Sequence, residues 1–340
     1  MEVIIFLFLI LNNPSNFVFI LSLISGTVIS ISSSSWLGIW IGLEINLLSF
    51  IPIINKNGSP YETESAIKYF LVQAIASIIF LIAILIREII DFSIELYCPY
   101  LISRALLIKI GAAPFHFWFP GVIEGISWIN CFILITWQKI APFILISYKL
   151  INNILVMVIF ISTLIGSVGG LNQNSTRKII AYSSIGHLGW IISAIIIRNN
   201  LWLIYFIIYS LLNIAVLYLF YNQSIYQLSQ AYFIKNNATI KFSIIIRILS
   251  LGGLPPFLGF LPKWLVIQGL SLQYSFFILL FIVIITLMTL YFYIRVIFRA
   301  FIFMSQENKW ARNKKSNELI ILSIIISIVG IPITTWIMIY

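Results

Sequence analysis

The same five-residue pattern occurs twice in the middle of an apolar run: Gly111-Ala112-Ala113-Pro114-Phe115 and Gly253-Leu254-Pro255-Pro256-Phe257. Proline removes a backbone donor and clashes with the preceding turn, and glycine lowers the cost of an unwound conformation. We therefore expect two helices that are broken inside their spans, from Gly111 to Pro114 and from Gly252 to Pro262. Unwound backbone in hydrocarbon survives only where it lines a polar cavity or is covered by protein.

The composition predicts the class of protein that contains these breaks. Of the 340 residues, 61% are hydrophobic and 9% are charged, and the mean hydropathy is +1.08. Apolar stretches of about 20 residues recur with one charge or none, whereas a soluble chain would interrupt them more often. The period-two alternation of a membrane β-barrel is absent. The sequence predicts an all-α polytopic membrane protein with a single membrane domain, 1–340, and no soluble domain.

A span of about 20 apolar residues divides the chain into about eleven expected transmembrane helices. They cover residues 17–31, 36–54, 66–86, 100–118, 126–147, 153–169, 178–197, 201–221, 240–272, 276–298 and 319–339. The two broken helices are the fourth and the ninth. Because five helices is an odd separation, the second group should be inverted relative to the first. We predict a first five-helix repeat over 17–148, an inverted second repeat over 153–299, and an extra C-terminal helix over 318–340.

Lysine and arginine are distributed unequally between the expected loops. One side, which includes the N-terminus, holds Lys56, Lys68, Arg177, Lys178, Lys235, Lys241, Arg299, Lys309, Arg312, Lys314 and Lys315; the other holds Arg87, Lys149 and Arg198. The positive-inside rule therefore places the N-terminus on the inner side and Tyr340 on the opposite side. This topology and anionic lipid explain the pI of about 9.6 without nucleic acid as a partner.

Four charged residues lie near the middle of apolar runs: Glu44, Lys109, Lys139 and Lys263. Each costs about 2.5–3.5 kcal/mol on insertion scales, so a functional role is the default interpretation. Lys109 and Lys263 stand beside the two breaks. Burial favours the neutral form of an amine, so these lysines can gain and lose a proton. Glu44 is the expected counter-charge, and the four residues are predicted to form a proton path.

Other polar residues have more ordinary explanations. Lysines and arginines near helix ends commonly extend to the interface, which we expect for Lys68, Lys149, Lys241, Arg295 and Arg299. His116 and His187 lie on apolar stretches, where a hydrogen-bonded core histidine is more common than a relay, and Glu124 lies in a connection where a structural role is favoured. These three residues are kept as candidate relays.

The sequence gives no indication of a bound cofactor or metal. Two cysteines, Cys98 and Cys131, and two histidines are too few for a metal cluster or a disulfide framework. The glycine-rich and Cys-x-x-Cys motifs of nucleotide, flavin and iron–sulfur proteins are absent. Redox chemistry is therefore expected in other polypeptides.

Several strings resemble the antiporter-like membrane subunits of mitochondrial respiratory complex I, in particular the NADH–ubiquinone oxidoreductase chain 2 family, in an insect-like form. They are Trp40-Ile41-Gly42-Leu43-Glu44-Ile45-Asn46, Lys109 to Trp118, Thr136-Trp137-Gln138-Lys139, Ala181 to Trp190, Gly252 to Phe257 and Pro262-Lys263-Trp264. The resemblance covers essentially residues 12–340. It implies that Glu44 is a regulatory glutamate, Lys109 and Lys263 the lysines of two half-channels, and Lys139 the lysine that connects them.

The resemblance also implies a location and partners. The chain would lie in the mitochondrial inner membrane, with the N-terminus in the matrix and the C-terminus in the intermembrane space. Its expected partners are other membrane-arm subunits of complex I and phospholipids including cardiolipin, with no soluble substrate bound directly. Two alternatives remain: an independent cation/proton antiporter, and a structural membrane scaffold in which the four buried charges tolerate neutral replacement.

Three arginines depart from the resemblance, since Arg104, Arg198 and Arg247 occupy positions where small polar residues are expected. The chain is rich in isoleucine yet has 5 methionines. Reading an invertebrate mitochondrial message with the standard codon table would turn some methionines into isoleucine and some serines into arginine. Our hypothesis is that part of this sequence is such a misreading.

Overall fold

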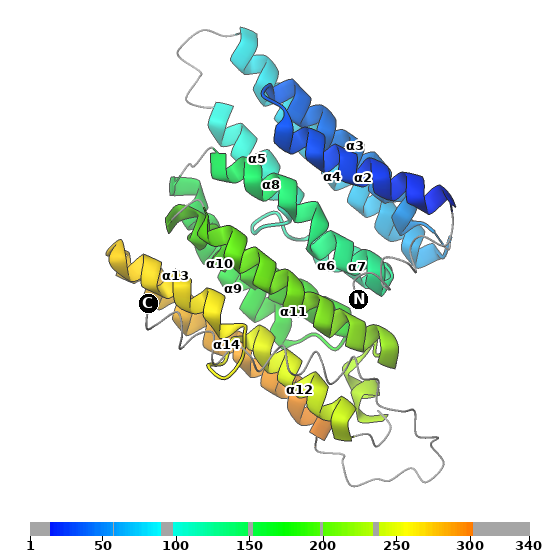
Figure 1. Ribbon diagram of the computed structural model, residues 1–340, viewed down its shortest axis with the longest axis vertical. Coiled ribbons are helices and arrows are strands. Elements are labelled where there is room, and N and C mark those ends of the chain that lie inside the picture. The colour runs from blue at the N-terminus through cyan, green and yellow to red at the C-terminus, as the bar shows by residue number, and fades with distance from the viewer. Residues whose placement is uncertain are drawn as a thin grey trace. The chain divides into compact units, whose positions relative to one another are not determined.

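The computed structural model describes residues 14–56, 58–89, 98–148, 152–197, 200–233 and 238–301 (Figure 1). Within these ranges the regular structure is helical, apart from an isolated antiparallel bridge between Ser175 and Gln227. The helices are α2 (Pro14–Ser32), α3 (Trp36–Ile54), α4 (Pro60–Ile89), α5 (Cys98–Ile110), α6 (Trp118–Gly125), α7 (Trp128–Ile135), α8 (Trp137–Tyr148), α9 (Asn152–Leu171), α10 (Thr176–Ile197), α11 (Leu201–Gln223), the 3₁₀ helix η1 (Leu228–Phe233), α12 (Ala238–Gly252), α13 (Phe260–Leu272) and α14 (Phe276–Phe301).

The predicted all-α membrane class is confirmed. In the described ranges, 7 helices are long and apolar enough to cross a membrane: Trp36–Ile54, Pro60–Glu88, Trp128–Tyr148, Asn153–Leu171, Thr176–Ile197, Leu201–Gln223 and Phe276–Phe298. Shorter apolar helices include Asn16–Ser32, Phe242–Gly252 and Phe260–Leu272. The expected helix over 319–339 lies outside the described residues.

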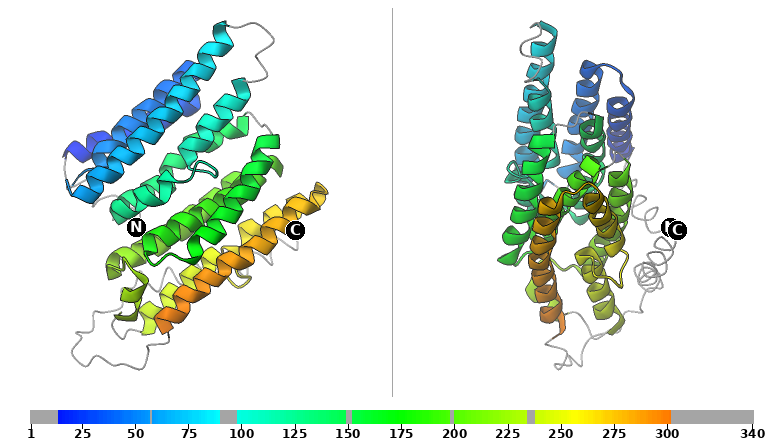
Figure 2. Two further views of the ribbon diagram at one scale, coloured as in Figure 1. Left: turned by 180° about the vertical axis from the view of Figure 1, so that it is seen from behind. Right: turned by 90° about the vertical axis from the view of Figure 1, so that its left-hand side faces the viewer.

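The chain divides into two compact units, Met1–Val158 and Ile159–Tyr340. In the first unit α3 packs against α2 and α4, and α5 packs against α4 and α8. In the second unit α10 contacts α11 and α13, and α14 contacts α12 and α13. Both views of Figure 2 show the helices within each unit running alongside one another. The predicted inverted relation of the two repeats stays a prediction.

A glycine allows close helix packing in each unit. A Cβ atom at Gly42 of α3 would lie 2.5 Å from the backbone nitrogen of Ser30 on α2. In the second unit, a Cβ atom at Gly166 of α9 would lie 2.4 Å from the backbone nitrogen of Gly186 on α10. Small residues let helix backbones approach in this way, which gives dispersion contacts that lipid chains do not replace.

Both predicted helix breaks are present, and their backbones match. Gly111 and Gly253 each have φ of +74°, the left-handed conformation that glycine adopts without a Cβ penalty. The next residue in each case, Ala112 or Leu254, donates its N–H back to the carbonyl of Leu107 or Leu249. This is the hydrogen-bond pattern of a Schellman helix end, so the same local chemistry ends α5 and α12.

The lengths of the breaks differ from the sequence-based expectation. Helix resumes at Trp118 after the first break and at Phe260 after the second, in each case seven residues after the left-handed glycine. The first break therefore extends beyond Pro114, and Pro262 does not close the second because it lies in the first turn of α13. Proline is tolerated there, since the first N–H groups of a helix have no partner within the helix.

A further interruption was not predicted. The span expected over 126–147 is divided into α7 and α8 at Thr136, whose φ and ψ are −110° and −70°. The Thr136 hydroxyl donates to the carbonyl of Phe132 over 2.7 Å. Such bonding to the residue four positions earlier bends helices, which accounts for an irregular turn three residues before Lys139.

Candidate functional site

Lys109 lies in the last turn of α5, immediately before the first break, and is only 7% exposed. The carbonyl end of a helix carries partial negative charge, which favours a cation in the last turn. The Gln73 side chain of α4 donates to the backbone carbonyl of Lys109 over 3.3 Å. The local sequence thus places an amine beside unwound backbone that a neighbouring helix supplies with a hydrogen bond.

Glu44 lies in the middle of α3 and is partly exposed. Its carboxylate interacts electrostatically with Lys109 on α5 and with Tyr69 on α4. One carboxylate oxygen is buried and has no hydrogen-bond partner within the described ranges. The structure therefore brings the predicted acid and the first predicted lysine together in one unit.

A chain of neutral polar side chains adjoins this pair. Gln138 of α8 donates to the Asn46 side chain of α3 over 2.9 Å, and it accepts from the Tyr69 hydroxyl over 3.3 Å. The chain therefore connects three helices within the first unit, and its central residue, Gln138, directly precedes Lys139.

Lys139 of α8 is 2% exposed, so its side chain is among the most deeply buried in the described ranges. Its Nζ has no hydrogen-bond partner there and lies 4.5 Å from the centre of the Phe119 ring on α6. An ammonium over a ring face gains about 0.5–2 kcal/mol. The role of Lys139 as a connection between two half-paths stays a prediction.

Lys263 lies in the first turn of α13 and is 7% exposed. Its side chain reaches back over the second break, where Nζ donates to the Gly252 carbonyl over 2.6 Å. That carbonyl belongs to the C-terminal residue of α12, so the ammonium satisfies a group with no partner in its own helix. A Cβ atom at Gly253 would lie 2.8 Å from Lys263 Cδ, so this glycine also makes room for the lysine.

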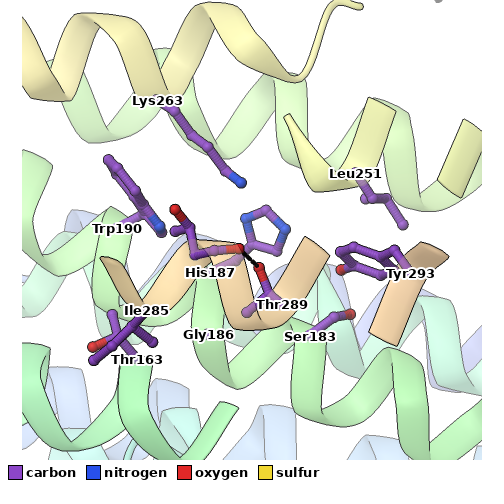
Figure 3. Close-up of a pocket in the computed structure, with 11 residues that line it drawn as sticks. Thr163, Ser183, Gly186, His187, Trp190, Leu251, Lys263, Ile285, Thr289 and Tyr293 are labelled. Atoms are coloured by element: carbon purple, nitrogen blue, oxygen red, sulfur yellow. Dashed lines mark hydrogen bonds between the residues drawn. The ribbon is translucent and has the colours of Figure 1, made fainter. Parts of the chain in front are cut away.

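His187 of α10 and Lys263 line one cavity of about 20 Å³, large enough for a water molecule. The Lys263 side chain points toward the His187 ring in Figure 3. The other polar lining side chains are Thr163, Ser183, Trp190, Thr286, Thr289 and Tyr293. His187 Nδ1 also lies 2.9 Å from the Tyr205 hydroxyl. The side chains around this cavity can therefore pass a proton between the Lys263 amine, water, the His187 imidazole and hydroxyl groups.

The remaining candidate residues occupy different settings. His116 lies in the first break, 6% exposed, with Nδ1 3.3 Å from the Pro114 carbonyl oxygen. Glu124 is exposed near the end of α6. No group of three His, Cys, Asp or Glu side chains that could hold a metal occurs within the ranges that the structure describes.

The sequence analysis missed the side chains that surround the four charges. Asn46, Gln73 and Gln138 are amides inside apolar runs, and Tyr205 and Tyr293 place hydroxyls in the core. The amides were detectable, because an amide in a span needs a partner. The tyrosines were not, because most tyrosines in such a chain belong to interfaces and packing.

The sequence model of the family described as NADH:quinone oxidoreductase/Mrp antiporter, TM, matches residues 33–289. The chain is 50% identical over 324 residues to NADH-ubiquinone oxidoreductase chain 2 of Anopheles gambiae, covering 93% of this chain and 95% of that protein. Its identity to the protein of the same name in Locusta migratoria is 45% over 324 residues, covering 94% and 95%.

Solved structures show the same fold at lower identity. A chain of respiratory complex I from Thermus thermophilus superposes with a TM-score of 0.78 and 20% identity, covering 92% of this chain and 77% of that one. A chain of an archaeal membrane-bound sulfane sulfur reductase gives a TM-score of 0.77 and 17% identity, covering 94% and 73%.

Proposed function

Because the chain belongs to the family of NADH–ubiquinone oxidoreductase chain 2 proteins, we propose that it is a proton-translocating, antiporter-like subunit of respiratory complex I. It acts within an enzyme, an H⁺-translocating NADH:ubiquinone reductase, whose electron transfer takes place in other subunits. The observation that carries the proposal is the pair of buried lysines at two matching helix breaks. Each is an amine that can exchange a proton beside polar, unwound backbone.

In the first unit, the gain and loss of a proton by Lys109 is controlled by the charge of Glu44. The Lys109 ammonium is favoured by the Glu44 carboxylate and by the carbonyl end of α5. Moving or neutralising Glu44 removes part of this stabilisation, so Lys109 then gives up its proton more readily. Redox events elsewhere in the complex can drive translocation by displacing the acid.

In the second unit, the gain and loss of a proton by Lys263 is controlled by the cavity that it lines with His187. The Lys263 ammonium is held by the Gly252 carbonyl and lies 5.8 Å from the centre of the Trp190 ring. A proton that leaves Lys263 can pass to water in the cavity and then to His187. Lys139 is assigned the connection between the two half-paths.

We assign the chain to the mitochondrial inner membrane, with its N-terminus in the matrix and its C-terminus in the intermembrane space. The charge asymmetry of the loops and the names of the relatives support this. Only 22% of the Phe276–Phe298 span is buried, against 89% of Thr176–Ile197. The exposed face of α14 suits other membrane-arm subunits or phospholipids, among which cardiolipin fits the basic inner loops.

The test is replacement of each lysine in the assembled complex. Lys109→Ala and Lys263→Ala should each lower the number of protons translocated per NADH oxidised, while NADH oxidation by the peripheral modules persists. Lys68→Ala is the matched control, because Lys68 is exposed and pairs with Glu64 on the same helix. Lys109→Arg and Lys263→Arg should also lower the number of protons translocated per NADH oxidised, since guanidinium does not release its proton. Unchanged translocation in both alanine variants contradicts the proposal.

An independent cation/proton antiporter is the alternative, favoured by the Mrp antiporters that share the matching family description. Purified chain in liposomes distinguishes the two functions. Exchange of Na⁺ or K⁺ for protons by the chain alone supports the antiporter, whereas proton movement that requires the assembled complex supports the subunit.

A further inference from the structure

The second unit contains two cavities that meet at three shared residues. One is the cavity of Lys263 and His187, and the other extends toward Thr176 at the start of α10; each is about 20 Å³, enough for a water molecule. Ser183, Leu251 and Tyr293 line both. Figure 3 shows these three side chains together, on the side of His187 that faces away from Trp190.

Two of the shared residues carry hydroxyl groups, Ser183 of α10 and Tyr293 of α14, and these side chains lie close to each other. The Ser183 hydroxyl donates to the Ile180 carbonyl over 2.8 Å, so its oxygen is still able to accept a hydrogen bond. Both side chains are at most 5% exposed. The third shared residue, Leu251, is apolar, so the hydroxyl pair is the polar connection at this boundary.

Tyr293 is also close to the histidine side of the first cavity. It lies near Tyr205, whose hydroxyl lies 2.9 Å from His187 Nδ1. The hydroxyl pair therefore adjoins both the cavity of Lys263 and the side chains that hold His187.

The far end of the second cavity lies at a basic helix start. Thr176 is 2% exposed, and its hydroxyl is directed to the carbonyls of Ile225 and Tyr226, at 2.9 and 3.0 Å. Arg177 and Lys178 follow it in the sequence. This is the end that the positive-inside rule places on the matrix side.

Hydroxyl groups can carry a proton across such a boundary. A hydrated proton in the first cavity protonates the Tyr293 oxygen, and Tyr293 passes its own hydrogen to the Ser183 oxygen. Ser183 then turns its hydroxyl away from the Ile180 carbonyl and releases its hydrogen to water in the second cavity. Each group ends with one hydrogen, so the transfer needs no oxidant, reductant or net change in the side chains.

We propose that the Ser183–Tyr293 hydroxyl pair is the proton relay between Lys263 and the Thr176 end of the second unit, so that this unit exchanges protons with the matrix side. The proposal rests on the proposed function, because it assumes that protons move through Lys263.

The experiment compares single-oxygen deletions in the assembled complex within inner-membrane vesicles. Tyr293→Phe and Ser183→Ala each remove one hydroxyl and keep most of the side chain's shape. We expect both to lower protons translocated per NADH oxidised as far as Lys263→Ala does, with the amount of assembled complex unchanged. Ser183→Thr keeps the hydroxyl and should retain translocation. Tyr291→Phe is the control, because Tyr291 is 62% exposed on the same helix.

The outcomes separate the relay from the proposed function. Normal translocation in Tyr293→Phe and Ser183→Ala, together with loss in Lys263→Ala, overturns the relay and leaves the function standing. Normal translocation in all three overturns the function as well. If Ser183→Thr fails as Ser183→Ala does, packing and not the hydroxyl is responsible, which also overturns the relay.

Discussion

The lysine sites of the two units stabilise a buried ammonium group in different ways. Lys109 interacts with a carboxylate, Glu44, on another helix of its unit. Lys263 is held by the Gly252 carbonyl and lies near the Trp190 ring. No Asp or Glu occurs between Glu124 and Glu307, so the described part of the second unit contains no carboxylate. The first site therefore responds to a change in one charge, whereas the second depends on the geometry of backbone dipoles and a water-sized cavity.

The lysines also stand on opposite sides of their breaks. With Gly111 aligned on Gly253, Lys109 corresponds to Leu251, and Lys263 corresponds to Gly121. The first amine precedes its break and the second follows it. Both amines nevertheless lie at the C-terminal end of the helix before the break. Lys109 belongs to that helix, α5, whereas Lys263 reaches the end of α12 from the helix that follows the break.

The largest difference in proton translocation between the two units should appear when Gly111 and Gly253, the glycines in the left-handed conformation, are each replaced by alanine. At φ of +74° a Cβ atom costs about 1–2 kcal/mol at either site. At Gly253 it would also lie 2.9 Å from Lys263 Nζ and displace the ammonium, whereas at Gly111 the nearest atom is a Trp118 ring carbon at 3.2 Å. Gly253→Ala should therefore abolish the translocation that Lys263 supports, and Gly111→Ala should mainly lower stability.

Thermal unfolding of the purified complex and protons per NADH give the two readouts. Gly121→Ala is the control, since no atom lies within 4 Å of the added Cβ and its φ is ordinary. Equal loss of translocation in Gly111→Ala and Gly253→Ala would show that the breaks, and not the position of Lys263, determine the effect.

Neutralising Glu44 should change the protonation of Lys109 in the first unit and leave that of Lys263 in the second unit unchanged. Glu44→Gln removes the charge that favours the Lys109 ammonium, so this lysine should lose its proton at lower pH. Translocation that requires protonated Lys109 should then fall off at a lower pH, by about one unit for each 1.4 kcal/mol of lost interaction. Glu44→Asp should have a milder effect. The pH dependence of translocation measures the shift.

The control for this experiment is an exposed carboxylate of the same unit. Glu64→Gln removes a charge that pairs with Lys68 on the surface of α4, where an ion pair contributes little. An identical pH profile in Glu44→Gln and Glu64→Gln would mean that Glu44 does not control Lys109.

Local chemistry in the sequence predicted the helix α3 over residues 36–54 and the positions of both broken helices. The break at Gly253 follows from glycine and proline alone, but its end does not, because Pro262 is compatible with the first turn of a helix. The bend at Thr136 depends on one side-chain hydrogen bond inside an apolar run. Contacts such as Gln138 with Asn46 join residues far apart in the chain, and packing between helices, which no local pattern specifies, sets which side chains meet.

A smaller effect is expected from the amide that links three helices of the first unit. Gln138→Leu leaves the Asn46 amide oxygen and the Tyr69 hydroxyl without this partner, at a cost of about 1–3 kcal/mol. The free energy of unfolding should fall by that amount, with a weaker effect on translocation. In the second unit, Gln268→Leu is the matched control because Gln268 is exposed on α13. Similar melting temperatures for the two variants would contradict a structural role for the amide chain.

The smallest expected difference concerns two arginines, one in each unit. It is the difference in mass between arginine in the printed sequence and serine in the natural chain. Arg247 is 1% exposed in α12, and the serines four residues before and three after it, Ser243 and Ser250, are fully buried on the same helix face. A serine at 247 would complete a row of small residues whose hydroxyls bond within their own helix, as Ser250 does with the carbonyl of residue 247. Arg104 of α5, in contrast, is exposed in the middle of an apolar run.

A charge in either setting is costly in a membrane, so we expect the natural chain to carry serine at both positions, as the codon-table hypothesis predicts. Mass spectrometry of peptides from the natural protein measures this directly, and residues 44, 109, 139 and 263 serve as positions where no difference from the printed sequence is expected. Arginine found at 104 and 247 would refute the hypothesis. The second unit would then contain a second buried cation, Arg247, whose guanidinium donates to the Ala215 carbonyl. Because a guanidinium keeps its proton, Arg247 would act on Lys263 as a fixed charge and not as a carrier of protons.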